Sequence, residues 1–463
     1  MRLKVFGHYI CLPLLLLGIT ESAAVLLAYG LAFMLIVDSN DEATALREQA
    51  ALFTICVVTS MFTLGLYCQR LRDRFSGIVL RISVSLLLGG LLARLLSLLF
   101  LDEWIPRLVI AAAVTASGII LLLTRRIMQH LNDGDVFKRR VLVLGAGRCA
   151  ARVLRLRRRA DQRGFRIVAF MPMEGDDLAA EIAANRLVPL KGRLIDCARS
   201  LAVHEIVVAL DDRRQNFPFR ALLECRLAGI EISELPDFLE RETGKVFLDC
   251  VSPSWLIFGG GFRRGWLRQG LERGFDLIVS GAMVIVGLPF MLLVAIAIKL
   301  EDGFGAPVLY RQERVGQYGL IFNVLKFRSM RIDAESDGVA SWAQKNDARV
   351  TRVGAIIRKT RLDELPQLLN VFAGTMSFVG PRPERPTFVA RLGEEIPFYD
   401  GRHSVKPGIT GWAQLCYPYG ASDRDALEKL QYDLFYVKNH GLIFDFMILL
   451  QTVEVILLGK GAR

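Results

Sequence analysis

Hydrophobic residues gather in four runs at the start of the chain. The runs cover roughly Ile10–Val37, Ala51–Tyr67, Ile78–Phe100 and Ile105–Leu123, and most approach the ~20 residues that a membrane-spanning helix needs. A signal peptide is the alternative for the first run, because Arg2 and Lys4 precede it. Three more runs follow, however, and no clear cleavage site is present. The pattern therefore predicts a four-helix transmembrane domain over residues 1-130.

Charged residues around these runs predict the orientation of the bundle. Basic residues precede the first run, separate the second from the third, and follow the fourth: Arg2, Lys4, Arg70, Arg72, Arg74, Arg81, Arg125 and Arg126. The other two loops are acidic, with Asp38, Asp41, Glu42, Asp102 and Glu103. Because cytoplasmic loops carry the excess of lysine and arginine, we expect both ends of the bundle in the cytoplasm. Glu21 and Arg94 lie within the runs, where helix–helix polar contacts are favoured over a functional role.

A later hydrophobic segment, Leu277–Ile298, is also long enough to cross a membrane. Basic residues lie on both of its sides, however, which favours a cytoplasmic position for both of its ends. Pro289 lies in the middle, where proline removes a backbone donor and kinks a helix. These features predict a re-entrant membrane helix over residues 275-299, with its break at Pro289. A fifth span is the alternative.

The pattern between these hydrophobic regions predicts an α/β Rossmann-like domain over residues 138-251. A buried strand at Arg140–Leu144 precedes a GxGxxA motif formed by Gly145, Gly147 and Ala150, and further strands are expected at Phe165–Phe170, Glu205–Ala209 and Gly229–Ser233. No acid ends the second strand, so no partner for a cofactor ribose is evident. A structural or regulatory role is therefore favoured over an NAD-using one, and we do not expect NAD. Arg155, Arg157, Arg158 and Arg159 are expected to coat a surface, with phosphate binding as the alternative, and residues 252-270 to form a linker.

Charge and cysteine content narrow the class of protein. The net charge of +11 suits an anionic membrane surface or phosphorylated substrates. No zinc-finger, helix-turn-helix or RNA-binding signature is present, so nucleic acid is not an expected partner. The eight cysteines are scattered without paired spacing, which indicates a reducing compartment rather than a disulfide framework. The five histidines are equally dispersed, which argues against a His/Cys metal site.

Candidate chemistry concentrates in the last part of the chain, residues 271-463. Asp363 and Glu364 are adjacent and lie beside Arg358, Lys359 and Arg361. Two acids in a basic setting suit anionic chemistry, with one carboxylate to attack phosphorus and one to hold a divalent metal. A solvated helix face is the alternative. Pro366 fits the first turn of a helix, which would place Asp363 near a helix N-terminus, where backbone donors favour phosphate.

Two segments of this region, LDELPQLLNVFAGTMSFVGPRPE and KPGITGWAQ, closely resemble the bacterial sugar transferases. These are the polyprenyl-phosphate hexose-1-phosphate transferases, or monotopic phosphoglycosyl transferases. The architecture resembles the large subfamily with four N-terminal spans, and the closest resemblance is to its exopolysaccharide-associated branch. It implies a membrane α-helical bundle plus an α/β Rossmann-like domain plus a mostly α-helical monotopic catalytic domain with a re-entrant membrane helix. It also implies transfer of sugar-1-phosphate from a UDP-sugar to undecaprenyl phosphate, releasing UMP, at the bacterial inner membrane with the middle and catalytic domains facing the cytoplasm.

The resemblance also implies roles for individual residues. Asp363 would be the nucleophile that forms a phosphosugar-aspartyl intermediate, and Glu364 would bind Mg²⁺, with Mn²⁺ as the alternative. Arg358 would steady the pair or the phosphate, and Pro289 matches the break of the family's re-entrant helix. Residues expected to bind substrate are Arg382 and Glu384 for the nucleotide, and Lys326, Arg328, Arg311 and Arg314. For Lys326 and Arg328, structural salt bridges are the near-equal alternative.

Some questions stay open at this level. After Trp412-Ala-Gln414 the chain continues with Leu415–Gly420, where many relatives carry Asn-Gly-Arg, so the donor sugar is undetermined. The run Leu442–Leu458 is expected to lie on the membrane as an amphipathic helix, or else to dock on the catalytic core. A homodimer fits the bulky middle domain. Competing functions are a membrane-tethered NAD-dependent enzyme acting on nucleotide sugars and a non-catalytic scaffold of polysaccharide assembly.

Overall fold

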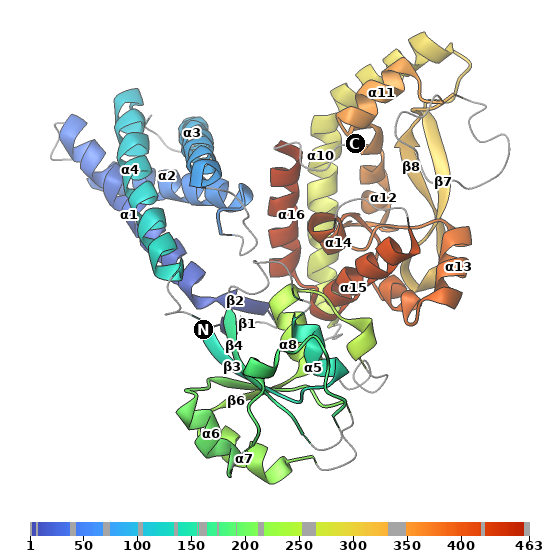
Figure 1. The fold of residues 1–463 in the computed structure, drawn as a ribbon. Helices are drawn as coiled ribbons and strands as arrows, with labels where there is room; N and C mark the ends of the chain where they lie inside the picture. The colour runs from blue at the N-terminus through green and yellow to red at the C-terminus, as the bar shows by residue number, and fades with distance from the viewer. Residues whose placement is uncertain are drawn as a thin grey trace. The chain divides into compact units, whose positions relative to one another are not determined.

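The computed structural model describes residues 2–5, 8–37, 43–67, 75–100, 105–133, 138–154, 156, 164–173, 176–190, 192–211, 217–251, 265–331, 349–417 and 422–457. Contacts between residues divide the chain into two compact units, Met1–Val251 and Ser252–Arg463. Figure 1 shows the elements with their labels.

The first unit begins with a hairpin and four long helices. The hairpin pairs β1 (Arg2–Val5) with β2 (His8–Cys11) in antiparallel register. The helices follow as α1 (Leu12–Ile36), α2 (Ala43–Thr63), α3 (Phe75–Phe100) and α4 (Arg107–Asp133). Their shared core contains fully buried Tyr29 and Phe53, whose ring centroids are 5.1 Å apart. The four predicted helices are therefore present, and the hairpin was not anticipated.

Three of these helices are long and apolar enough to cross a membrane: Leu15–Ile36, Gly77–Leu99 and Arg107–Ile127. By the same measure of length and composition α2 falls outside this group, although we expected a span at Ala51–Tyr67. The reason lies in its first two turns, where Arg47, Glu48 and Gln49 lower the hydrophobicity of a 21-residue helix.

Glu21 makes a helix–helix contact within the bundle, as predicted. Its carboxylate accepts hydrogen bonds from Arg125 Nε at 2.7 Å and Nη2 at 2.9 Å, and Arg125 Nη1 donates to the Leu66 carbonyl at 2.7 Å. This bidentate pair satisfies two charges that the apolar surroundings would otherwise penalise. The loop charges that predict orientation lie outside the described residues, apart from Arg81, Arg125, Arg126 and the N-terminal pair, so orientation stays a prediction.

The remainder of the first unit is an α/β Rossmann-like domain. Its four strands are β3 (Arg139–Leu144), β4 (Phe165–Met171), β5 (Glu205–Val208) and β6 (Glu231–Glu234), and they form a fully parallel sheet in the order β4-β3-β5-β6. The predicted strands are thus confirmed to within about two residues at each end. The arginines at 155 and 157–159 lie outside the described residues.

Helices cover both faces of this sheet because alternate strand residues point to opposite sides. On one face α5 (Arg148–Leu154) and α8 (Leu235–Thr243) pack over Val141, Val143 and Val207. On the other face α6 (Leu194–Ser200) and α7 (Phe219–Leu227) pack over Leu142, Leu144, Ile206 and Val208. Two short 3-10 turns, η2 (Ala184–Arg186) and η3 (Leu248–Cys250), complete the domain.

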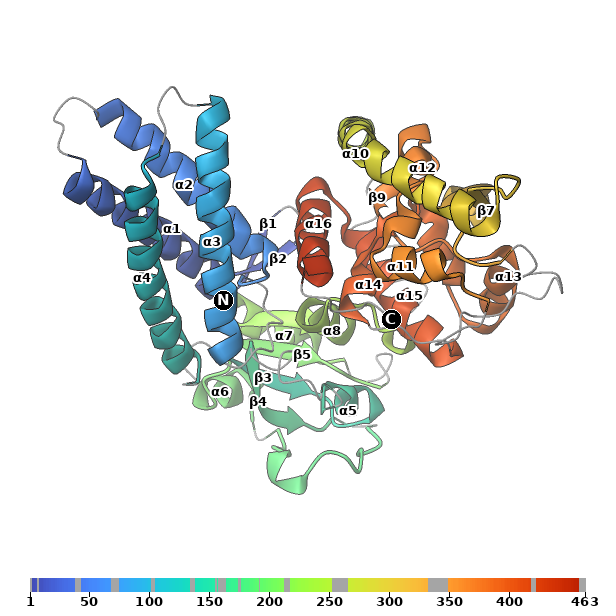
Figure 2. The ribbon, with the colours of Figure 1, turned by 90° about the horizontal axis from the view of Figure 1, so that it is seen from above.

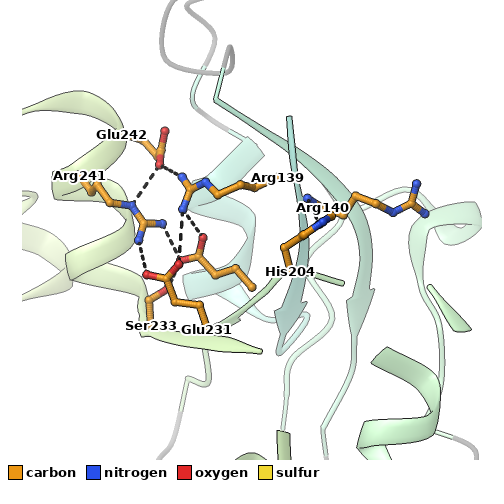
Figure 3. Close-up of polar contacts among 8 residues, drawn as sticks. Arg139, Arg140, His204, Glu231, Ser233, Arg241 and Glu242 are labelled. Carbon is orange, nitrogen blue, oxygen red and sulfur yellow. Dashed lines mark hydrogen bonds and ion pairs between the residues drawn. The ribbon is translucent and has the colours of Figure 1, made fainter. Parts of the chain in front are cut away.

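A buried ion-pair network lies at the amino ends of the strands (Figure 3). Glu205, which is fully buried at the start of β5, accepts from Arg139 Nη1 at 2.6 Å and from the Ser233 hydroxyl at 2.6 Å. Arg241 from α8 also pairs with Glu205, and Glu242 pairs with both arginines. The network therefore joins β3, β5, β6 and α8.

Breaking this network should destabilise the protein strongly. We expect Glu205→Gln to lower the free energy of unfolding by about 3 kcal/mol, because two buried guanidinium groups then lose their shared carboxylate. Thermal unfolding of the purified chain measures the effect, with Glu224→Gln on the exposed face of α7 as the control. An unfolding temperature equal to that of the control would contradict a stabilising role.

The second unit is mostly helical, as predicted. Its helices are α10 (Trp266–Asp302), α11 (Arg352–Lys359), α12 (Gln367–Ala373), α13 (Pro386–Glu395), α14 (Trp412–Cys416), α15 (Asp423–Asn439) and α16 (Leu442–Leu457), with 3-10 turns η4 (Gln317–Gly319), η5 (Leu362–Glu364) and η6 (Tyr399–Ser404). Two small sheets accompany them. One is the antiparallel hairpin β7 (Leu309–Val315) and β8 (Ile321–Phe327), and the other is the parallel pair β9 (Ser377–Val379) and β10 (Gly408–Thr410).

The helix α10 is the fourth candidate membrane segment. It runs unbroken for 37 residues with Pro289 inside it, so the predicted break is not seen as an interruption. Figures 1 and 2 instead show a bend part-way along the helix. A proline explains a bend in a continuous helix, since its ring clashes with a preceding carbonyl and one hydrogen bond is lost. Re-entrance itself stays a prediction.

The C-terminal helix α16 docks on the core of its own unit, which was the alternative to lying free on a membrane. Phe444 and Ile448 are buried in the same cluster as Val371, Met376 and other residues of α12 and its following loop. The Asp445 carboxylate also faces inward and accepts from the Tyr436 hydroxyl at 2.8 Å. The outer face of α16 stays exposed and carries Ile443, Phe446 and Val453.

Candidate active site

The hairpin β7–β8 supplies one wall of the site. Lys326 is paired with Tyr310, and Arg314 is paired with Phe322. Paired residues share a face of the hairpin, as do residues four apart on one strand, so Lys326 and Arg314 lie on the same face. Asn370 of α12 holds β8 in place, because its side chain accepts from Leu325 N at 2.9 Å and donates to the Asn323 carbonyl at 2.8 Å. The asparagine of the LPQLLN sequence therefore positions the strand that carries Lys326.

A short turn brings the two adjacent acids to this wall. The helix α11 begins at a Thr351 cap, whose side-chain oxygen accepts from Gly354 N at 2.9 Å, and it ends after Lys359. Arg361 then adopts the left-handed conformation with φ of 61°, which costs a non-glycine residue energy and is concentrated at functional sites. The turn leads directly into η5, which contains Asp363 and Glu364.

Glu364 is a carboxylate held by two cations. Its Oε1 accepts from Arg382 Nη2 at 3.0 Å and from Lys326 Nζ at 3.5 Å, and its side chain is 15% exposed. Burial alone would raise the pKa of Glu364, but Arg382 and Lys326 outweigh it and hold that pKa at about 2. Burial lowers the pKa of the Lys326 ammonium itself, so the nearer Arg382 is the principal partner of this carboxylate.

Asp363 has the opposite environment. Burial and the neighbouring Glu364 charge raise the pKa of Asp363, although Lys326, Arg361 and Arg358 oppose them. Among the described residues its buried Oδ1 accepts no hydrogen bond. A buried carboxylate oxygen with no partner is rare, because leaving it unpaired costs free energy. This oxygen is therefore available to a reacting group rather than committed to the fold.

The turn Gly380–Glu384 supplies a second wall of the site. It follows β9, and the Glu384 carbonyl accepts from Val315 N at 2.9 Å at the end of β7. Arg314 fastens the turn, since its Nη1 donates to the Pro383 carbonyl at 3.1 Å and lies 3.5 Å from Glu384 Oε2. The turn thus presents Arg382 toward Glu364.

Arg402 is a residue of the site that sequence reasoning did not identify. It is buried, pairs with Asp433 of α15 at 2.8 Å, and its Nη1 donates to the Tyr399 hydroxyl at 2.8 Å. Its Nη2 also donates to the Arg382 carbonyl at 2.9 Å. Arg402 therefore fixes the backbone from which the Arg382 guanidinium reaches Glu364. A basic residue near the KPGITGWAQ segment was the only available signal.

Models of two protein families match parts of this chain, one in each unit. The model of the family described as "Bacterial sugar transferase" matches residues 267–459, and that described as "CoA-binding domain" matches residues 63–232. An undecaprenyl-phosphate galactose phosphotransferase of Salmonella typhimurium is 31% identical over 390 residues, which are 79% of this chain and 79% of that protein. The chain belongs to the bacterial sugar transferase family.

Two further relatives match shorter stretches of this bacterial sugar transferase. A UDP-N-acetylgalactosamine-undecaprenyl-phosphate N-acetylgalactosaminephosphotransferase of Aeromonas hydrophila is 42% identical over 53% of this chain and 56% of its own length. The exopolysaccharide production protein PSS of Rhizobium leguminosarum bv. phaseoli is 44% identical over 41% of this chain and 98% of its own length. The matched part thus spans little more than half of the Aeromonas protein.

The sugar transferase brings together only some of the predicted site residues. Lys326, Arg382, Asp363 and Glu364 meet, Arg358 lies close enough for its charge to affect Asp363, and Arg314 and Glu384 support the turn. Arg311 is exposed on the opposite face of the hairpin, paired with Leu325. Arg328 donates from Nε to the Pro307 carbonyl at 3.0 Å, which is a backbone hydrogen bond and not the salt bridge named as its alternative. Of Leu415–Gly420, residues 418–420 lie outside the described residues.

The residues of the site fit a Mg²⁺ ion shared with a substrate diphosphate. No group of three or more histidine, cysteine or acidic residues with metal-binding geometry occurs in the described part of the chain, so an all-protein cage is not indicated there. Mg²⁺ commonly binds through one or two carboxylates plus substrate phosphates. An ionised Glu364 provides such a carboxylate.

Arg402 should matter for activity without touching substrate. We expect Arg402→Lys to lower kcat/KM for the nucleotide-sugar donor about tenfold or more, because lysine cannot make the three directed contacts of the guanidinium. Asp433→Asn should act through the same contact, so the double variant should be scarcely worse than either single one. Steady-state UMP release measures all three. Strictly additive losses would show that the two residues act independently.

Proposed function

We propose that this chain transfers a sugar-1-phosphate from a UDP-sugar to undecaprenyl phosphate and releases UMP. The observation that carries the proposal is the buried, unpartnered Asp363 oxygen beside a Glu364 carboxylate whose charge is offset by Arg382 and Lys326. The relatives named above support it, since two of them are named as phosphotransferases acting with undecaprenyl phosphate. The scaffold and NAD-dependent alternatives have no comparable support.

In the proposed first step, Asp363 acts as the nucleophile. Its free carboxylate oxygen attacks the sugar-linked phosphorus and forms a new P–O bond. The bond from that phosphorus to the bridging oxygen breaks, and UMP leaves with the electron pair. Arg382 and Lys326 offset the negative charge that accumulates between the two anions. Mg²⁺, when bound with Glu364, would supply further positive charge against the diphosphate.

In the proposed second step, a phosphate oxygen of the lipid acceptor attacks the same phosphorus. The aspartyl–phosphorus bond breaks, Asp363 regains its carboxylate, and the product is a lipid diphosphate sugar. The two-step path lets a soluble donor and a membrane-bound acceptor use one small site in turn. The helix α10, which is apolar enough to enter a membrane, belongs to the same unit as the site.

Release of UMP by the purified full-length protein tests the whole reaction. The protein in detergent with Mg²⁺ is offered a panel of UDP-sugars, each with and without undecaprenyl phosphate. We expect turnover to need the lipid and to favour one sugar. The panel is necessary because the relatives are named for different sugars, galactose and N-acetylgalactosamine. If no UDP-sugar in the panel gives UMP, the proposal is wrong.

The covalent intermediate has a separate test. The protein is incubated with its donor but without lipid acceptor, then digested and analysed by mass spectrometry. We expect the mass of a sugar phosphate on the peptide that contains Asp363. Turnover without any such adduct, even after rapid acid quenching, would indicate direct transfer between the two substrates instead.

We further propose that the protein resides in the bacterial inner membrane, with the middle and catalytic domains facing the cytoplasm, and initiates exopolysaccharide or related glycan synthesis. Support for the topology comes from the basic residues at both ends of α10, such as Arg268, Arg273 and Lys299. Single cysteines in place of Gly265 and Gly303, in a background without other cysteines, should both react from the cytoplasmic side if α10 is re-entrant. Labelling from opposite sides would establish a span.

A further inference from the structure

The loop after β3 lies where dinucleotide-binding folds hold their ligand. In the order β4-β3-β5-β6 the strand β4 lies on one side of β3, and β5 and β6 lie on the other. The connections before and after this point therefore run toward opposite edges of the sheet, and the change falls between β3 and β5. Ligands of such sheets bind beyond the carboxyl ends of the strands at this reversal, with their phosphates on the glycine-rich loop and the following helix. Here that position contains Gly145 and Gly147 after β3, and Asp211 shortly after β5.

The backbone amides of this loop already have acidic partners from the chain itself. Asp211 Oδ2 accepts from Arg148 N at 2.9 Å, and Asp211 Oδ1 accepts from Cys149 N at 2.8 Å. Asp176, from the segment after β4, accepts from Ala146 N and Met173 N, both at 2.9 Å. Gly145 N donates to the Met171 carbonyl at 2.7 Å. The amides of Gly145, Ala146, Arg148 and Cys149, which could otherwise serve a ligand phosphate, are thus committed.

The glycines of the loop accommodate this carboxylate. A Cβ at Gly147 would lie 2.0 Å from Asp211 Oδ2, so only glycine leaves room for the side chain. Gly145 has a φ of 115°, and a Cβ there would lie 2.5 Å from the Ala209 carbonyl oxygen. In a ligand-binding fold the second glycine lets the pyrophosphate approach the backbone. In this chain the same gap is filled by Asp211.

We infer that Asp211 takes the place of a ligand phosphate, so that the middle domain is a structural module that holds neither CoA nor a dinucleotide at its glycine-rich loop. This inference departs from the description "CoA-binding domain" of the family model that matches residues 63–232. It rests on committed amides and on the position of a carboxylate, and it is independent of the proposed transferase reaction.

Electrostatics adds to the exclusion of an anionic ligand. The amides of Cys149 and Arg148 lower the pKa of Asp211 although partial burial opposes them, so its carboxylate is ionised at neutral pH. A diphosphate placed on the loop would have to displace this charge and break two charge-assisted hydrogen bonds. Asp176 would oppose it from the other side of the loop.

Hydrogen–deuterium exchange on the full-length protein tests the inference. Peptides that cover residues 145–150 should exchange slowly in the wild-type protein without any ligand, because Asp211 and Asp176 protect their amides. Millimolar CoA, NAD⁺ or ADP should leave that exchange unchanged. Asp211→Asn should accelerate it about tenfold or more, since an amide oxygen replaces a carboxylate that accepts two bonds. Asp196→Asn, an exposed acid in the first turn of α6, is the matched control.

Two results would overturn the inference. The first is slower exchange of residues 145–150 in the wild type when CoA, NAD⁺ or ADP is added, which would show that the loop binds that ligand. The second is equal exchange in the Asp211→Asn and Asp196→Asn proteins, which would show that Asp211 does not hold the loop. The wild-type titration needs no variant, so it decides the matter even if Asp211→Asn unfolds. Transferase activity plays no part in either result.

Discussion

Asp363→Asn is expected to lower lipid-dependent UMP release by about 10³-fold or more. The variant keeps the shape of the side chain but replaces the nucleophilic carboxylate by a neutral amide, and losses of this size are typical when a covalent nucleophile is removed. Binding of the nucleotide sugar should persist, because Arg382, Lys326 and Glu364 are unchanged. Residual activity above about one tenth of the wild type would show that Asp363 is not the nucleophile.

The same variant should make the protein more stable. The pKa of Asp363 is raised above that of the unfolded chain, so the ionised side chain disfavours folding at pH values above its folded pKa. A neutral amide removes that cost and the repulsion from Glu364. Thermal unfolding at neutral pH should therefore occur at a higher temperature for Asp363→Asn than for the wild type. Glu394→Gln, on the exposed part of α13, is the control and should change neither activity nor unfolding.

Glu364→Gln is expected to lower activity by about 10²-fold or more, and to lower stability as well. Activity falls because a neutral amide is a poor ligand for Mg²⁺ and no longer offsets Arg382. Stability falls because the pKa of Glu364 is lowered to about 2 in the folded protein, so its ionised form favours folding. The loss should be on the order of 3 kcal/mol, because the pKa falls from 4.5 to about 2 and a pKa difference of one unit corresponds to about 1.4 kcal/mol.

The pH dependence distinguishes this explanation from simple loss of packing. The stabilisation from Glu364 is fully present above the unfolded pKa of 4.5 and is lost as pH falls toward about 2. The gap in unfolding temperature between wild type and Glu364→Gln should therefore narrow below pH 4.5. A gap that stays constant down to the acid limit would point to packing. Two adjacent carboxylates should thus respond to the same substitution with opposite changes in stability.

The hydrophobic pattern was sufficient for the larger architecture. Continuous apolar runs mark the N-terminal helices, and the short apolar strands beginning at Arg139, Phe165 and Glu205 mark the sheet, because burial imposes these periodicities directly. It was less reliable for α2, where charges in the first turns reduce the apolar length. It also could not decide whether α16 lies on a membrane or on the core, because either surface would bury the same apolar face.

The site was predictable only where the chain itself brings residues together. Asp363 and Glu364 are neighbours in sequence, and their basic surroundings were visible there. The contact of Glu364 with Lys326 joins residues 38 apart, and that of Arg402 with the Arg382 carbonyl joins residues 20 apart. Nothing in the sequence indicates which of many arginines makes such contacts. Arg311 illustrates the difficulty, because one position along a strand separates the two faces of the hairpin.

The polar side chains of α10 tie this helix to three elements of the site. Arg273 donates to the Val371 and Phe372 carbonyls at the end of α12, at 2.8 and 2.7 Å. Buried Asp276 accepts from the Ser377 hydroxyl at 3.1 Å in β9, and Glu301 accepts from Arg352 N and Val353 N, at 2.7 and 2.8 Å, at the start of α11.

These three attachments couple α10 to the elements that carry the candidate site. An apolar helix adjusts its tilt to the thickness of the bilayer that it enters. Because α12, β9 and α11 are all hydrogen-bonded to α10, we expect a change in the tilt of α10 to move β9, which leads to Arg382, together with α11, which leads to Asp363. If α10 enters the bilayer as proposed, we therefore expect the thickness of the surrounding lipid to change the rate of the proposed reaction.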